Sequence, residues 1–201
     1  MSNVDATMQD QALHPVLAAI VVELTHERNG LLAAADRIPV HLRHTRSAPD
    51  RWTAAEILAH LAKVEASSGK LFSVHARALR EANAPLDTTS DAATIVADFA
   101  RFPLLVRSRR ITAPDMVTPD ADADFDTARL QLESSRAHLL EAIYKANGLP
   151  LGSVSAPHPR LGSMTMYEWL LMIARHEARH VEQLRELSAQ LLSDTPQPLP
   201  E

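Results

Sequence analysis

The chain has 201 residues, a formal net charge of −5 and no cysteine, a length that fits one domain with an adequate core. The lack of cysteine excludes disulfides, iron–sulfur clusters, Cys-based zinc fingers and a cysteine nucleophile, and the charges form no basic stripe that would indicate a nucleic-acid partner. The first ten residues are polar and acidic, and the longest apolar stretch, Val16 to Val22, is too short to span a bilayer, so we expect a cytoplasmic protein with no membrane partner.

A low glycine content, with only 5 in the chain, favours helices throughout. The first is predicted over residues 4–38, because Leu17, Ile20 and Leu24 recur at helical spacing. Pro39 ends it, since proline cannot continue a helix.

The second helix is predicted over residues 53–83 and has a strong start signal. Thr53 and Glu56 stand at the spacing of a capping box, in which each side chain bonds to the backbone N–H of the other residue. Trp52 and Ile57 flank them as a hydrophobic staple.

A weaker helix is predicted over residues 90–111, bent or broken near Pro103. Residues 112–124 are rich in proline and aspartate and indicate a loop. Residues 125–146 are helical again, and Asn147 with the following glycine ends that helix.

Residues 149–163 contain three prolines and are expected to form a loop. Thr165 and Glu168 then repeat the capping box and begin the last helix, which runs to about Leu192. No alternating strand pattern is visible. Four main helices and a minor one predict an all-α bundle, as a single domain over residues 1–192 followed by a flexible tail over 193–201.

Two histidines, His176 and His180, stand four positions apart inside the last helix, so their side chains share one face. The helical period places Met172 and Gln183 in the same sector, which indicates that this face is turned inwards. His60 occupies an apolar sector of the second helix. Three inward imidazoles are hard to satisfy with protein groups alone, and a metal ion resolves the difficulty by accepting a lone pair from each ring.

Two alternatives remain open at this point. A single inward histidine is more often a hydrogen-bonded core residue than a metal ligand. The string from His176 to His180 also matches the zincin H-E-x-x-H motif, in which Glu177 would be the general base of a metalloprotease. A zincin requires a further metal ligand downstream, and only about twenty residues follow His180.

Four segments carry a resemblance to a known family: residues 51–62, 113–119, 157–170 and 176–183. The first resembles the opening of the second helix of the DinB/YfiT-like superfamily, and the last resembles its paired-histidine signature. Residues 157–170 resemble its loop into the last helix, residues 113–119 resemble a further landmark of the family, and the likeness spans about residues 16–187. Residues 85–119 as a whole match the family features poorly.

The resemblance implies an antiparallel four-helix bundle of DinB/YfiT-like connectivity with one extra short helix, often a homodimer. It also implies a divalent metal, Zn²⁺ or Ni²⁺, held by His60, His176 and His180. Members of the family include metal-dependent hydrolases and transferases or isomerases that use low-molecular-weight thiols such as mycothiol or bacillithiol.

The expected function is therefore that of a metal-dependent enzyme acting on a small molecule. A cation held by three neutral histidines can activate a water or a thiol, so hydrolase and low-molecular-weight-thiol S-transferase both remain open. Glu56 and Gln183 are candidates to support the ligands, and His158 is a candidate to contact substrate. The alternative is a non-catalytic stress-response or binding bundle with a structural metal.

Overall fold

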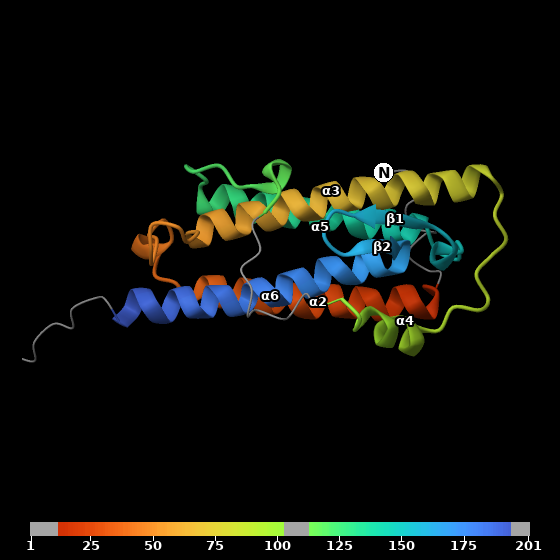
Figure 1. Ribbon diagram of the computed structural model, residues 1–201, viewed down its shortest axis with the longest axis horizontal. Helices are drawn as coiled ribbons and strands as arrows, with labels where there is room; N and C mark the ends of the chain where they lie inside the picture. The colour runs from red at the N-terminus through yellow and green to blue at the C-terminus, as the bar shows by residue number, and fades with distance from the viewer. Residues whose placement is uncertain (1–11, 103–112, 194–201) are drawn as a thin grey trace, which may run out of the picture.

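The computed structural model describes residues 12–102 and 113–193, which form a bundle around four long helices (Figure 1). The long helices are α2 (Pro15–Asp36), α3 (Ala54–Glu81), α5 (Phe125–Lys145) and α6 (Met166–Ser193). The all-α four-helix fold is as predicted. Consecutive helices α2 and α3 are antiparallel, as are α5 and α6, whereas α3 and α5 run in the same direction (Figure 1). None of the helices in the described ranges is long and apolar enough to cross a membrane.

The helix starts follow the capping signals. Thr53 N–H donates to Glu56 Oε2 at 2.8 Å and Glu56 N–H to Thr53 Oγ1 at 3.1 Å, which confirms the first capping box. Thr165 and Glu168 make the same pair of bonds at the start of α6, at 2.8 and 3.3 Å. Both boxes satisfy backbone donors that a helix start would otherwise leave unpaired.

The predicted start of the first helix at residue 4 is too early within the described part of the chain. Residues 12–14 are not helical, and α2 begins at Pro15, where proline is favoured in the first turn. His14 caps this start by accepting the N–H of Val16 on its Nδ1 at 3.4 Å. Residues 4–11, and the predicted tail beyond Ser193, lie outside the described residues.

The connection between α3 and α5 returns along the bundle, because those two helices are parallel. It contains the predicted extra helix, α4 (Ala92–Phe99), and a 3₁₀ turn, η2 (Asp115–Val117). Helix α4 is shorter than the predicted range of 90–111, of which residues 103–111 are not described. Two further 3₁₀ turns are η1 (Val40–Leu42) and η3 (Leu151–Ser153).

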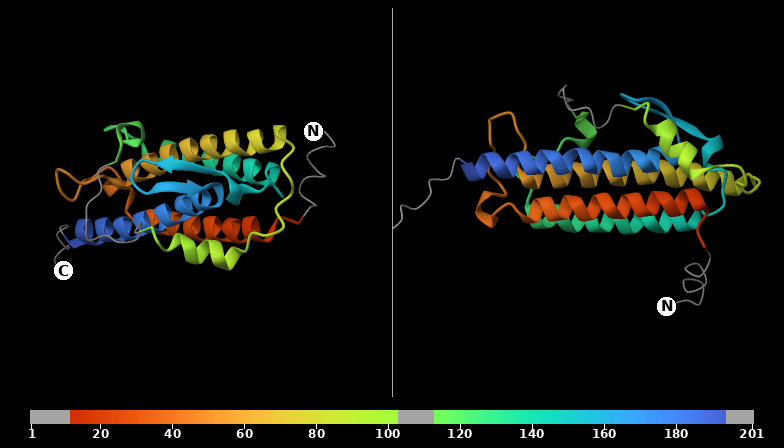
Figure 2. Two further views of the ribbon diagram at one scale, coloured as in Figure 1. Left: turned by 45° about the vertical axis from the view of Figure 1, so that its right-hand side comes forward. Right: turned by 90° about the horizontal axis from the view of Figure 1, so that it is seen from below.

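Residues predicted to be a loop before α6 contain a short antiparallel hairpin, which corrects that expectation. Strand β1 (Ser155–His158) pairs with β2 (Gly162–Thr165), and Ala156 lies opposite Met164. Gly162 has a φ of 82°, a conformation that favours glycine at this turn. Figure 2 shows the hairpin, α4 and η2 on the side of the bundle formed by α3 and α6.

The apolar core has two parts, one towards each end of the bundle, with a charged layer between them. One part contains Leu24, Phe72, Leu139 and Ala174. The other contains Leu31, Ala62, Leu132 and Val181. In every long helix a buried charged residue lies between a member of one part and a member of the other. These four residues are Arg28, Glu65, Arg136 and Glu177.

Candidate metal centre

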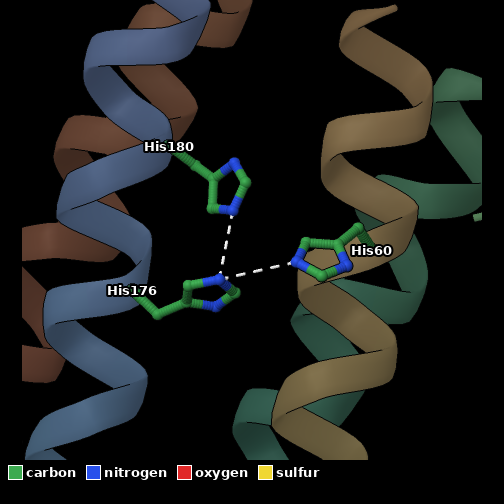
Figure 3. A group of neighbouring side chains, drawn as sticks. All are labelled: His60, His176 and His180. Atoms are coloured by element: carbon green, nitrogen blue, oxygen red, sulfur yellow. Dashed lines mark hydrogen bonds between the residues drawn. The ribbon is translucent and has the colours of Figure 1, made fainter. Parts of the chain in front are cut away.

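Three histidines from two helices point towards a common centre (Figure 3). His60 comes from the second turn of α3, and His176 and His180 lie one turn apart on α6. The Nε2 atom of His176 is 3.5 Å from Nε2 of His60 and 3.2 Å from Nε2 of His180. One ring nitrogen from each of the three lies within 4.8 Å of the others, so they could share one ion. The sequence prediction brought together the same three residues.

A hydrogen bond on the side of the ring that faces away from the other two histidines orients His60. Its Nδ1 lies 2.7 Å from the carbonyl oxygen of Val117 in η2, so this nitrogen carries the proton and donates it. The Nε2 lone pair of His60 therefore faces the other two histidines. The η2 segment is in turn tied to α3, because the ammonium of Lys63 donates to the carbonyl of Thr118 at 3.0 Å and to the carboxylate of Asp120. Metal-binding histidines are commonly oriented by such a carbonyl.

The other two rings lack a comparable anchor. Among the described residues, Nδ1 of His176 and Nδ1 of His180 are buried without a hydrogen-bond partner. Burial lowers the pKa of His176 to about 3, with further lowering from His60, Arg179 and His158. Burial also takes the pKa of His180 well below its usual value. Both rings are therefore neutral at physiological pH, the state in which imidazole binds a metal.

The three rings cannot complete one another's hydrogen bonds. A neutral imidazole has one ring proton, and His60 has placed its proton on the nitrogen that faces Val117. Nε2 of His176 lies close to two other Nε2 atoms but has at most one proton to donate. A divalent cation would accept one lone pair from each ring, and three neutral histidines suit Zn²⁺ or Ni²⁺. The donor set thus fits the predicted cofactor.

Trp52 forms an aromatic wall beside the histidines. Its ring centroid lies 4.8 Å from that of His60 and 6.4 Å from that of His180, nearly parallel to the latter at 15°. The sequence analysis assigned Trp52 only to the helix start. Its position directly before the α3 capping box, two turns before His60, is the signal that could have placed it at the centre.

The comparisons with known proteins identify the family of this chain. The family model described as the DinB superfamily matches residues 23–184. This chain belongs to the DinB superfamily. A relative named "Uncharacterized protein YuaE", from Bacillus subtilis (strain 168), is 23% identical over 150 residues, which cover 71% of this chain and 80% of that protein.

The fold also has a counterpart among solved structures. The crystal structure of TT2238, described as a four-helix bundle protein, superimposes with a TM-score of 0.55 at 21% identity. The match covers 85% of this chain and 98% of that one. At this identity the likeness shows the shared four-helix-bundle fold.

The two residues predicted to support the metal ligands of this DinB-superfamily chain, Glu56 and Gln183, lie on α3 and α6 respectively. Glu56 is buried, and its carboxylate accepts from Thr53 N–H and pairs with Arg46. Gln183 lies one turn beyond His180, and its side chain is the group that opposes the lowering of the pKa of His180.

The candidate substrate contact, His158, ends strand β1 beside Trp169. The centroids of these two rings are 5.2 Å apart. Its Nδ1 accepts the backbone N–H groups of Arg160 and Leu161, both at 3.2 Å, which fixes the hairpin turn. Burial lowers the pKa of His158, and the charge of Arg160 acts in the same direction.

Glu177 is not placed as a zincin base. The residue is 1% exposed, and its carboxylate is turned away from the histidines towards Arg28 of α2 and Arg136 of α5. Arg28 Nε donates to Glu177 Oε1 at 2.9 Å, and Arg136 Nη2 lies 3.2 Å from both carboxylate oxygens. The metalloprotease alternative requires this carboxylate near the reacting water, and the observed contacts leave it no such role.

The cluster of four buried charged residues was not predicted from the sequence. Arg28, Glu65 and Arg136 each stand on the apolar stripe of a helix, a position that charged residues seldom occupy without a partner. One such residue in each of four helices, two of them basic and two acidic, is a pattern that could have predicted the cluster. The pairing itself joins residues up to 149 positions apart.

Proposed function

We propose that this protein is a metal-dependent enzyme acting on a small molecule, as a hydrolase or as a low-molecular-weight-thiol S-transferase. Its cofactor would be one Zn²⁺ or Ni²⁺ held by His60, His176 and His180. The observation that carries the proposal is the convergence of three neutral ring nitrogens on one centre, with the Nδ1 proton of His60 committed to a carbonyl.

A divalent cation with three neutral ligands, when bound, supplies activation of a water or a thiol at neutral pH. The chain itself supplies orientation and shielding. The carbonyl of Val117 sets the tautomer of His60, and the ring of Trp52 lies against His60 and His180 on one side of the centre. A small reactant would reach the centre from the side of His176, because this is the least buried of the three histidines.

We assign the supporting residues according to their contacts. Gln183 is assigned to the support of His180, because its side chain interacts with that ring from one turn further along α6. Glu56 acts through the start of α3, since its oxygens bind Thr53 and Arg46. His158 would contact substrate from the hairpin, consistent with its electrostatic influence on His176.

We further propose that the protein works as a cytoplasmic homodimer. Exposed large apolar side chains on the long helices support this assignment, among them Val22, Val74 and Leu130. The mass of the protein in solution, measured by light scattering, tests it, and a monomer at micromolar concentration would contradict it.

The enzymatic proposal is tested with protein loaded with Zn²⁺ or Ni²⁺. Ester and amide substrates are assayed with water alone, and electrophilic substrates with a low-molecular-weight thiol. We expect turnover in one of the two assays, abolished by His180→Ala and retained by His138→Ala, which removes an exposed histidine of α5. Metal binding with no turnover in either assay would favour the non-catalytic alternative with a structural metal.

A further inference from the structure

The four residues of the charged layer in the middle of the bundle hydrogen-bond to one another, and Ser135 also donates to Glu65. Arg28 donates to Glu177 and Glu65, and Arg136 donates to the same two carboxylates. The remaining nitrogen of each guanidinium also has a partner, because Nη1 of Arg28 donates to the carbonyl of Leu132 at 2.8 Å and Nη1 of Arg136 to that of Leu24 at 2.6 Å.

This layer constrains how the helices lie against one another. Apolar side chains on either side of it tolerate small rotations and shifts of a helix, because their contacts are non-directional. Charged hydrogen bonds are directional, and a buried carboxylate left without its arginine is strongly unfavourable. The bonds of Glu177 to the two arginines are made together at one rotation and one height of α6.

Glu177 connects this constraint to the candidate metal ligands. It directly follows His176 and precedes His180 by three residues on the same helix. A helix turns by about 100° per residue, so fixing the direction of Glu177 towards α2 and α5 fixes the direction of both histidines. The figure of the site shows the two rings turned from α6 towards His60 on α3 (Figure 3).

The three histidines differ in how much their orientation depends on Glu177. His60 has its own anchor, the carbonyl of Val117 at 2.7 Å. His176 and His180 have no partner for Nδ1 within the described residues, so the α6 backbone and neighbours on the same helix, Gln183 among them, hold their rings. Their alignment therefore depends on the rotation of α6 more strongly than that of His60 depends on α3.

We propose that Glu177, clamped by Arg28 and Arg136, is a positioning residue that sets the rotation of α6 and thereby aligns His176 and His180 with His60 for metal binding. The inference rests on the proposed metal site. It gives the H-E-x-x-H glutamate of this chain a role in alignment.

The test uses Co²⁺ as the probe, because its visible absorption reports the number and geometry of ligands. Glu177→Gln keeps the shape of the side chain and removes its charge. Glu65→Gln is the matched control, since Glu65 is equally buried at 1% exposure and binds the same two arginines but lies on α3. Both variants should unfold at a lower temperature than the wild type.

We expect Glu177→Gln to weaken Co²⁺ binding about 10- to 100-fold, the range for residues that support metal ligands, and to change the absorption spectrum. Glu65→Gln should keep the wild-type spectrum and an affinity within a few-fold. If Glu177→Gln fails to fold, Glu177→Asp replaces it. Its carboxylate is one methylene shorter, so it should fold with a weaker, spectrally altered site.

Wild-type Co²⁺ affinity and spectrum in the Glu177 variant would overturn the assignment. An equal loss in Glu65→Gln would also overturn it, because the effect would then follow from general destabilisation. A wild-type protein that binds no Co²⁺ would refute the proposed metal site itself, and the assignment with it.

Discussion

Two buried polar clusters occupy the middle of the bundle, and they differ in how far their members satisfy one another. In the charged layer, Arg28, Glu65, Arg136 and Glu177 supply matched donors and acceptors. In the histidine cluster, two Nδ1 atoms of the described chain have no partner, and three Nε2 atoms face one another. A cluster complete in itself contributes to structure, whereas an incomplete one indicates a missing ligand.

The sharpest way to break the charged layer is Arg136→Met. It leaves Glu65 and Glu177 each with one arginine fewer, and breaking a buried ion pair costs about 3–5 kcal/mol. We expect that loss in the free energy of unfolding, measured by urea denaturation of the metal-free protein.

Substitution in the histidine cluster should change the free energy of unfolding much less. Replacing a poorly satisfied polar group by an apolar one of similar size is nearly neutral, so His176→Leu should change metal-free stability by less than about 1 kcal/mol. Equal losses in Arg136→Met and His176→Leu would contradict the distinction between the two clusters.

Metal should stabilise only a protein with the complete histidine cluster. A ligand present at 100 times its dissociation constant stabilises the folded state by about 2.7 kcal/mol. We expect Zn²⁺ to raise the Tm of the wild type and of His138→Ala, and to leave that of His176→Ala unchanged. A similar rise in all three proteins would show that the ion binds elsewhere.

The pH dependence of metal-free stability follows from the pKa of His176, which burial lowers from 6.5 to about 3. Between these values the unfolded chain binds a proton that the folded chain does not. Stability is therefore lost as the pH falls from 6.5, by about 1.4 kcal/mol per pH unit for one such group.

His176→Leu removes this contribution, so its stability should fall less steeply between pH 6.5 and 4.5. Urea denaturation of both proteins in the presence of a chelator measures the difference in slope. Parallel pH profiles would mean that His176 takes up its proton in the folded state as readily as in the unfolded chain.

The smallest effect is expected at the support of His60. Lys63→Met frees the η2 segment from α3 and so loosens the carbonyl of Val117. The exposed ion pair with Asp120 contributes about 0–1 kcal/mol, so stability should hardly change, while Zn²⁺ affinity should fall by up to about tenfold. Lys70→Met, an exposed position of the same helix, should leave both unchanged.

Much of the fold was predictable because its signals are local. The capping boxes at Thr53 and Thr165 placed the starts of α3 and α6, and the apolar stripes placed the four long helices. The hairpin before α6 was not predictable, since each strand has four residues and β1 contains a proline. So short a segment shows no usable alternation.

For the site, too, local features were predictable from the sequence and long-range contacts were not. The spacing of His176 and His180 is a local pattern, whereas His60 was grouped with them because it occupies an apolar sector of another helix, and the resemblance to the family supported that grouping. The contact of His60 with Val117 spans 57 positions and involves a backbone carbonyl, which no side-chain pattern reveals. The pairing of Glu177 with Arg28 and Arg136 likewise exists only once the four helices have packed.

The most direct test of the account is the metal content of the wild type, purified without a histidine tag, beside that of His176→Ala. Elemental analysis should find about one divalent transition-metal ion per wild-type chain and none in the variant, which loses one of three ligands. A folded wild type that contains no metal, and takes up none when Zn²⁺ or Ni²⁺ is added, would contradict the central claim that these three histidines share a cation.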